Sequence, residues 1–309
     1  MYINEAKTKK GMCLNWNSIT NRMREIWNFR VMFFTSAFAC LGVLMTLWEI
    51  LGLFCKFDKM ECEQTISIIA GFIIIIVSFV YAYRKLFCRK DYLELEINKR
   101  TSLYVKKENL MAVNGVKVIP VNEYFDTHNG DGIINPYSLH GQFLSLFDGR
   151  IEELRQQIES QLSQMQPLPS NRQRSMVPGL PQVRYPLGTC IRITDNGNTY
   201  MLVAVTRFDQ NEHVDVATEE YPEIIRKMYN GIEHIQDGNP VYLPLIGSGI
   251  SGYQLTNMQL LDTLVQMAHN ADRLAVTKGI HICIYNDKQM DSLNLNIIEY
   301  LYNRWKTLK

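Results

Sequence analysis

The chain lacks an excess of charge of either sign. Its 32 basic and 31 acidic residues leave a formal net charge of +1 at pH 7, so its overall charge does not favour nucleic acid as a partner. Its seven cysteines have neither the spacing of a zinc site nor that of a disulfide framework. Cys55 and Cys62 can pair, whereas Cys190 and Cys283 are expected to be core residues. The sequence therefore assigns no metal ligands.

The usual motifs of nucleotide chemistry are also missing. The segment Gly247-Ser-Gly-Ile-Ser-Gly252 is rich in glycine, but the Lys-Ser or Lys-Thr of a Walker A loop does not follow it. Its glycine spacing fits a dinucleotide fingerprint, yet no acidic residue ends a suitable next strand. Thr127 to Ile134 imitates a calcium loop, but the strongest acidic ligands are absent, which excludes calcium.

Two long hydrophobic runs are present near the start of the chain. Residues 31–55 contain one charge, Glu49, and residues 65–83 contain none. As helices they would extend about 37 and 28 Å, enough to cross a hydrocarbon core of roughly 30 Å. Two buried helices of a soluble protein are the less favoured alternative. A cleaved signal peptide fits poorly, because thirty mostly polar residues precede the first run. We expect a membrane hairpin over residues 31–84.

Basic residues precede and follow this hairpin in the sequence, and they indicate its orientation in the membrane. The connecting loop holds only Lys56 and Lys59, beside three acids. The positive-inside rule therefore predicts a multi-pass protein with both termini in the cytoplasm, as a segment over residues 1–30 and a domain over residues 91–309. The flanking basic residues are Lys7, Lys9, Lys10, Arg22, Arg24 and Arg30 before the hairpin, and Arg84, Lys85, Arg89 and Lys90 after it.

The region after the hairpin alternates strand and helix patterns, which predicts a three-layer α/β domain. Five prolines preclude regular structure over residues 166–188. That stretch carries Arg172, Arg174 and Arg184 and no acid, so it is either a solvated loop or a contact for lipid headgroups or an anionic ligand. The expected strands are 92–97, 102–105, 116–122, 189–193, 199–208, 241–246 and 281–285, and the expected helices are 151–165, 218–234, 256–270 and 291–306.

Two strand ends are candidates for a ligand site, because ligands bind beyond the carboxyl ends of parallel strands. The strand 241–246 runs into the glycine segment, and a helix follows with Thr256 as N-cap and Gln259 as its capping-box partner. Strand, glycine loop and helix is an arrangement that suits a phosphate. After strand 116–122, Asn122 can hydrogen-bond a ribose or cap the loop, and Asp126 can accept from an adenine amino group or a sugar hydroxyl.

No catalytic residue is assigned. Ser248 and Ser251 lack an identifiable base. His140 lies in Ser138-Leu-His-Gly141, where Gly141 would let a ligand approach the main chain. A structural role for His140 at the start of a helix is an equally favoured alternative to ligand contact.

The segments Pro120-Val-Asn122 and Pro244 to Gly252 resemble the two ligand loops of macro domains. That resemblance implies binding of ADP-ribose, with the first loop around the distal ribose and the glycine loop around the diphosphate. Asn122-Glu-Tyr-Phe-Asp126 replaces the usual Asn-Ala-Ala-Asn, and Ile133 to Gly141 replaces the usual glycine run. Because macro-domain hydrolases draw on those loops, these departures disfavour hydrolysis.

With the two spans in front, Val121 to Thr127 and Ser138 to Gly141 resemble the membrane-anchored effectors of Thoeris antiphage defence. The resemblance implies an inner-membrane protein that binds an ADP-ribose derivative, namely a histidine conjugate made by a partner TIR enzyme. It then forms homo-oligomers, through faces such as Gly42, Gly52 and Glu49, and disrupts the membrane in abortive infection. The alternatives are a membrane-tethered ADP-ribosyl hydrolase or nucleotide-processing enzyme, and a plain scaffold. The implied ligand-binding residues are Asn122, Glu123, Phe125, Asp126, Ser138, Leu139, His140, Gly141, Gly247, Ser248, Gly249, Ile250, Ser251 and Gly252.

Overall fold

A computed structural model describes residues 30–54, 63–128, 133–169, 174, 180–209, 211–249 and 252–307. The chain divides into two compact units, one ending at Cys88 and the other beginning at Arg89. The predictions for residues 1–29, for Cys55 and Cys62 as a pair, and for Arg172, Ile250 and Ser251 lie outside the described residues.

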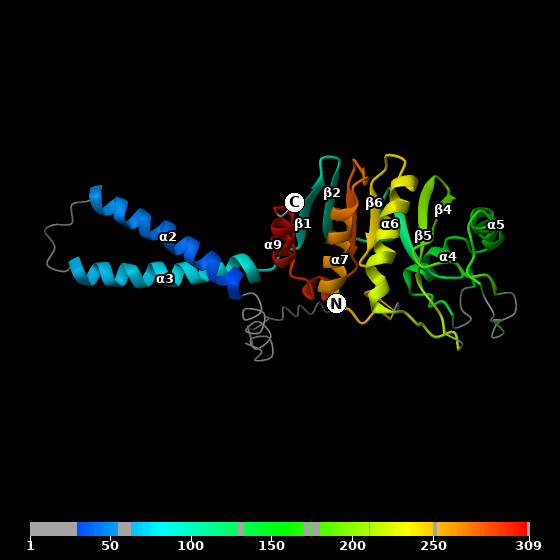
Figure 1. Cartoon of the computed structure of the whole chain (residues 1–309), viewed down its shortest axis with the longest axis horizontal. Helices are drawn as coiled ribbons and strands as arrows, with labels where there is room; N and C mark the ends of the chain where they lie inside the picture. The colour runs from blue at the N-terminus through cyan, green and yellow to red at the C-terminus, as the bar shows by residue number, and fades with distance from the viewer. Residues whose placement is uncertain are drawn as a thin grey trace, which may run out of the picture. The chain divides into compact units, whose positions relative to one another are not determined.

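The first unit contains two long apolar helices, α2 (Arg30–Phe54) and α3 (Glu63–Phe87), of 25 residues each (Figure 1). They contact each other, with the ring of Phe79 lying 5.9 Å from that of Phe33. Ala37 and Ala82 are buried, and small residues of this kind let helices approach closely. Most of the large apolar side chains point outward. Both helices are long and apolar enough to cross a membrane, as predicted.

The second unit is built on one mixed sheet of seven strands, in the order β1-β2-β7-β6-β3-β5-β4. The five central strands β2, β7, β6, β3 and β5 are parallel, and β1 and β4 pair antiparallel at the two edges. The strands are β1 Tyr92–Asn98, β2 Thr101–Lys107, β3 Val116–Asn122, β4 Cys190–Asp195, β5 Asn198–Thr206, β6 Val241–Pro244 and β7 Ile280–Ile284.

Helices cover both faces of this sheet, which confirms the three-layer α/β prediction. Alternate residues of β3 enter two separate cores: Val116 and Val118 pack with α6, α7 and α9, whereas Ile119 and Val121 pack with α4 and α5. Figure 1 shows α6 and α7 lying across one face of the sheet. The helices are η1 Leu110–Ala112, α4 Leu139–Ser145, α5 Ile151–Leu162, η2 Thr218–Glu220, α6 Tyr221–Ile235, α7 Asn257–Asn270, α8 Asp287–Asp291 and α9 Leu295–Lys306.

Most predicted elements are confirmed to within a few residues, and two are corrected. The helix expected over 291–306 starts only at Leu295, because Asn294 is extended and its side chain accepts from the Ile297 amide to cap α9, and a separate short helix, α8, precedes it. The strand expected to reach Ile246 ends at Pro244. The described residues of the Pro-rich segment form one isolated bridge, Leu168 to Arg184, and no helix or longer strand.

Candidate ligand-binding site

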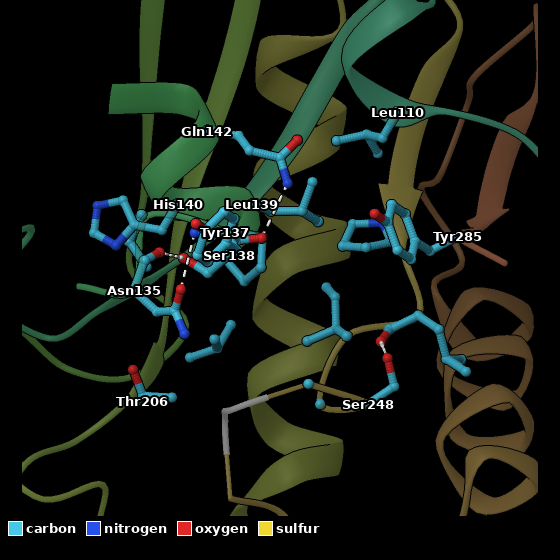
Figure 2. A pocket seen from close by; sticks show the side chains of 18 of the residues that line it. Leu110, Asn135, Tyr137, Ser138, Leu139, His140, Gln142, Thr206, Ser248 and Tyr285 are labelled. Carbon is cyan, nitrogen blue, oxygen red and sulfur yellow. Dashed lines mark hydrogen bonds between the residues drawn. The ribbon is translucent and has the colours of Figure 1, made fainter. Parts of the chain in front are cut away.

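A cavity of about 1120 Å³ lies at the carboxyl edge of the parallel strands. Every parallel strand ends on it: β3 and β5 with their last residues, Asn122 and Thr206, and the others with the residue that follows, Glu108, Leu245 and Tyr285. Parallel strands place all their carboxyl ends at one edge, which is where α/β sheets bind ligands. Figure 2 shows Asn135, Ser138 and His140 on one side of the cavity and Tyr285 on the other.

The loop after β3 is shaped by the side chain of Asn122. Its Oδ1 accepts from the amides of Tyr124 and Asp126, at 3.0 and 3.4 Å, and its Nδ2 donates to Asp126 Oδ2 at 3.0 Å. Asn122 is nearly buried and lines the cavity. Of the two roles expected for Asn122, the structure shows the loop cap. Phe125 in the same loop is left-handed, with φ of 54°, and packs in the core against Tyr185.

Beneath this loop lies a buried ion cluster formed by Arg174, Asp126 and Glu212. The Arg174 guanidinium donates to both oxygens of Asp126, at 2.7 and 2.8 Å, and to Glu212 Oε2 at 2.9 Å. The side chains of Arg174 and Asp126 are both 0% exposed. The Arg174 guanidinium also lies 3.9 Å from the ring centre of Tyr124. Burial alone lowers the pKa of Arg174, but its hydrogen bonds to the two carboxylates raise that pKa above its ordinary value.

This cluster corrects two expectations. Arg174 belongs to the Pro-rich segment, which was expected to be solvated or to contact lipid or an anionic ligand; its charge instead pairs with Asp126 inside the domain. Arg184 of the same segment lies 3.9 Å from the buried Glu123. Asp126 was expected to contact the ligand, but its carboxylate does not face the cavity, because it is occupied by Arg174 and Asn122.

The part of the lining next to the loop after β3 is made by the start of α4. Ser138 caps the helix by accepting from the Gly141 amide at 3.0 Å. His140 is buried, and its burial lowers its pKa to about 4, although its interaction with the Asp126 main chain acts in the other direction. The His140 ring is therefore neutral at pH 7. A Cβ at Gly141 would collide with the main chain of Asn135 and Pro136, so this glycine serves close packing rather than ligand approach.

The glycine loop forms the floor of the cavity. Gly247 needs its glycine, because its φ is +88° and a Cβ would lie 3.0 Å from Leu260. A Cβ at Gly249, in contrast, would meet nothing within 4 Å among the described residues. The Ser248 hydroxyl donates to the Leu245 carbonyl at 2.6 Å and accepts from Gln289 at 2.7 Å. Both hydrogen bonds of the Ser248 hydroxyl are therefore made within the protein.

The predicted capping box at the start of α7 is confirmed. Thr256 accepts from the Gln259 amide at 3.3 Å, and Gln259 accepts from the Thr256 amide at 2.9 Å. Two of the amides at this helix start are therefore already bonded within the box. A phosphate at the glycine loop would be met by loop amides rather than by these two.

Seven of the predicted residues line the cavity, and five described ones do not. Asn122, Ser138, Leu139, His140, Gly247, Ser248 and Gly249 line it. Glu123, Phe125 and Asp126 are buried beneath it, and Gly141 and Gly252 pack against the protein, Gly252 with φ of +76° beside Val214.

Sequence reasoning missed one whole side of the cavity, made by Glu108, Leu110, Tyr285, Lys288 and Gln289. The strand expected over 281–285 was the available signal, because the carboxyl end of a parallel strand reaches the same edge of the sheet as Asn122. Glu108 is paired with Lys106 at 3.0 Å. Seven carboxamide side chains line the cavity. Among its described lining residues, Glu108 and Lys288 carry a charge, whereas His140 is neutral. The carboxamides are Asn109, Asn122, Asn135, Gln142, Asn257, Asn286 and Gln289.

The chain is similar to proteins of one bacterial defence family. The family model described as Thoeris protein ThsA, Macro domain, matches residues 103–285. The Thoeris protein ThsA of Bacillus amyloliquefaciens (strain Y2) is 29% identical over 243 residues, which cover 75% of this chain and 77% of that protein.

Solved macrodomain structures are also similar at low identity. The Oceanobacillus iheyensis macrodomain with ADP is 10% identical, over 69% of this chain and 97% of that one, with a TM-score of 0.47. The same macrodomain with MES bound is 10% identical, over 69% and 98%, with a TM-score of 0.49. Since the family model covers more than half of its residues, this chain belongs to the Thoeris ThsA family, and its second unit is a ThsA macro domain.

Proposed function

We propose that the cavity binds an ADP-ribose-derived signal and that binding activates a membrane effector. The observation that carries this proposal is the convergence of all five parallel strands on one cavity, with an open glycine loop on its floor. The cavity's volume of about 1120 Å³ suits a ligand of dinucleotide size.

The glycine loop is the proposed site of the diphosphate. The space over Gly249 lets phosphate oxygens approach the main chain, where amide groups stabilise negative charge. Lys288, which also lines the cavity, adds a positive charge. Together they suit a small anion better than an uncharged ligand.

The two ends of the cavity suit the other parts of such a ligand. Tyr285 is 72% exposed and lines the cavity directly after β7, which makes its ring a stacking surface for a base. The carboxamides along the walls can both donate to and accept from ribose hydroxyls. The α4 wall, with Ser138 and His140, would hold the distal ribose and its histidine substituent.

Recognition is favoured over turnover by the state of the ionisable groups. Asp126 is held by Arg174, Glu108 by Lys106, and His140 is buried against the main chain of Asp126. General acid–base catalysis needs a group placed against the reacting atoms and free to exchange a proton. Each of these groups is instead engaged within the protein, so a membrane-tethered hydrolase is the less favoured function.

In this proposal α2 and α3 lie in the inner membrane with both termini in the cytoplasm, and a TIR enzyme supplies the signal. Two spans in one chain are too few to enclose a pore, so the effector would act as a homo-oligomer. The signal must bind the assembled state more tightly than the resting one, because equal affinity shifts no equilibrium. Assembly then disrupts the membrane.

The test is calorimetry on the full chain in lipid nanodiscs, with ADP-ribose, its histidine conjugate and NAD titrated separately. We expect the histidine conjugate to bind most tightly and to remain intact. Particle size, measured in detergent with and without the ligand, should rise on binding. Absence of binding by all three compounds would contradict the proposal, and release of free histidine from the conjugate would favour the hydrolase.

A further inference from the structure

We infer that Arg174 is a positioning residue for the ligand cavity, acting through Asp126 on two neighbouring parts of its lining, the end of β3 and the start of α4. The inference deepens the proposed function and rests on it. Arg174 does not line the cavity, yet the groups that it bonds connect directly to residues that do.

The first connection runs to the β3 wall. Arg174 holds both oxygens of the Asp126 carboxylate, and Asp126 Oδ2 in turn accepts from Asn122 Nδ2 at 3.0 Å. Asn122 lines the cavity at the carboxyl end of β3. Its side chain also sets the turn that follows, since its Oδ1 accepts from two loop amides. The position of the guanidinium therefore fixes the orientation of the Asn122 amide.

The second connection runs to the α4 wall. The main chain of Asp126 interacts with the buried His140 ring and raises its pKa against the larger effect of burial. Figure 2 shows His140 beside Asn135 and Ser138, across the cavity from Tyr285. Asp126 thus contacts the Asn122 and His140 parts of the lining while its carboxylate is bonded to Arg174.

The loop needs such a support because its backbone is strained. Phe125, directly before Asp126, has a φ of 54°, a conformation that a bulky residue adopts at an energetic cost and keeps only where its surroundings enforce it. Glu212, the other acid held by Arg174, also has a positive φ, of 59°. One guanidinium therefore joins two strained loops that leave neighbouring strands β3 and β5.

Arginine suits this position for a geometric reason. Its planar fork donates two parallel hydrogen bonds to Asp126 and still reaches Glu212, and its flat face lies over Tyr124. A lysine ammonium is a point charge and cannot reproduce this set of contacts. A lysine at residue 174 should therefore keep the charge but hold the Asp126 loop less rigidly.

The experiment compares Arg174→Met and Arg174→Lys with the wild-type full chain in nanodiscs, using calorimetry with ADP-ribose and its histidine conjugate. We expect Arg174→Met to weaken affinity roughly tenfold or more, and Arg174→Lys to weaken it less. Arg150→Met is the matched control: it removes a partly buried pair with Asp195, 2.9 Å long, at the β4–β5 turn. The affinity of the Arg150→Met variant for both ligands should equal that of the wild type.

A double-mutant cycle separates positioning from general stability. If Arg174 acts through Asp126, Arg174→Met should cost little further affinity in an Asp126→Asn background. Additive losses, or a folded Arg174→Met with unchanged affinity, would overturn the inference. Arg174→Met can fail to fold, because it leaves two buried carboxylates without their partner. In that case the neutralised triple variant R174M/D126N/E212Q replaces it, and wild-type affinity in the triple variant would also contradict the inference.

A readout without ligand keeps this inference distinct from the proposed function. Hydrogen exchange over residues 122–126 should speed up in Arg174→Met, while exchange in α7 stays unchanged. If the wild type binds none of the compounds, the proposed function fails, and exchange alone then decides whether Arg174 orders the loop. Unchanged exchange at residues 122–126 would show that it does not.

Discussion

The buried imidazole of His140 interacts with the main chain of Asp126, so a neutral histidine joins helix α4 to the loop after β3. The ring is buried, and its pKa is lowered to about 4, mainly by burial. The domain therefore contains a histidine that gains its proton only when the fold opens or the pH falls far below neutrality.

This arrangement predicts a loss of stability in mild acid. The unfolded chain binds a proton on His140 below pH about 6.5, whereas the folded chain does so only below about 4. Between these values the unfolded state binds more protons, so the free energy of unfolding should fall as the pH falls, by about 1.4 kcal/mol per unit and roughly 3 kcal/mol in all. Urea unfolding of the full chain in detergent at pH 7, 6, 5 and 4.5 measures the slope.

The matched variants for this slope are His140→Gln and His213→Gln. The His213 side chain is 78% exposed, and its loss should leave the slope as in the wild type. His140→Gln should flatten it. An equal slope in His140→Gln and the wild type would show that other groups cause the acid sensitivity.

A second prediction concerns the floor of the cavity. A Cβ at Gly249 would meet nothing within 4 Å among the described residues, so Gly249→Glu and Gly249→Gln should both fold with an unchanged melting temperature. The carboxylate would face the diphosphate, and at an effective dielectric constant of about 20 this repulsion should weaken binding roughly a hundredfold relative to the glutamine variant. Calorimetry with ADP-ribose compares the two. Equal affinities would place the diphosphate elsewhere in the cavity.

A third prediction concerns Tyr285, which is 72% exposed beside the cavity. If its ring stacks on the base, Tyr285→Ala should lose about 1–3 kcal/mol of binding free energy, and Tyr285→Phe should lose little. Ribose 5-phosphate, which has no base, should bind both variants and the wild type alike. A loss with Tyr285→Ala that is just as large for ribose 5-phosphate would contradict stacking.

A fourth prediction concerns the apolar hairpin. A Cβ at Gly42 would meet nothing within 4 Å among the described residues, so Gly42→Leu should leave the α2–α3 pair intact. In an oligomer, however, a glycine on a helix surface permits close approach of another helix, and leucine would prevent it. Ligand-dependent growth in particle size should therefore be lost while ligand affinity is kept. Gly71→Leu on α3, equally open, tests whether that face also takes part. Normal assembly in both variants would exclude these faces.

Local patterns in the sequence predicted most of the fold. Strand 116–122 and the capping box at Thr256 and Gln259 are confirmed, because alternation and helix caps depend on neighbouring residues. The start of the last helix was placed at Asp291 instead of Leu295, and the short helix α8 before it was not predicted. The N-cap at Asn294 sets the true start.

The site was harder to predict, because its key contacts join residues far apart in the sequence. Asp126 carries the chemistry of a ligand contact, and only the position of Arg174, 48 residues later, shows that its carboxylate is occupied. Gly141 fits the pattern of an open approach, yet it packs against Asn135. Tyr285 ends the strand expected over 281–285, but it was overlooked because the sequence alone does not show where that strand lies in the sheet. Its place on the cavity follows from the order of strands, which puts β7 between β2 and β6.

That strand order has a consequence for synthesis of the chain. The last strand, β7, links the β1–β2 hairpin to the rest of the sheet, and the cavity needs residues from Glu108 to Ser292. A ribosome makes the apolar hairpin first, and domains generally fold as units as they emerge. The cavity is therefore complete only after the chain has been made as far as Ser292. Under the proposed function, chains that already carry the hairpin but stop before Ser292 would lack the complete cavity and should not respond to the signal.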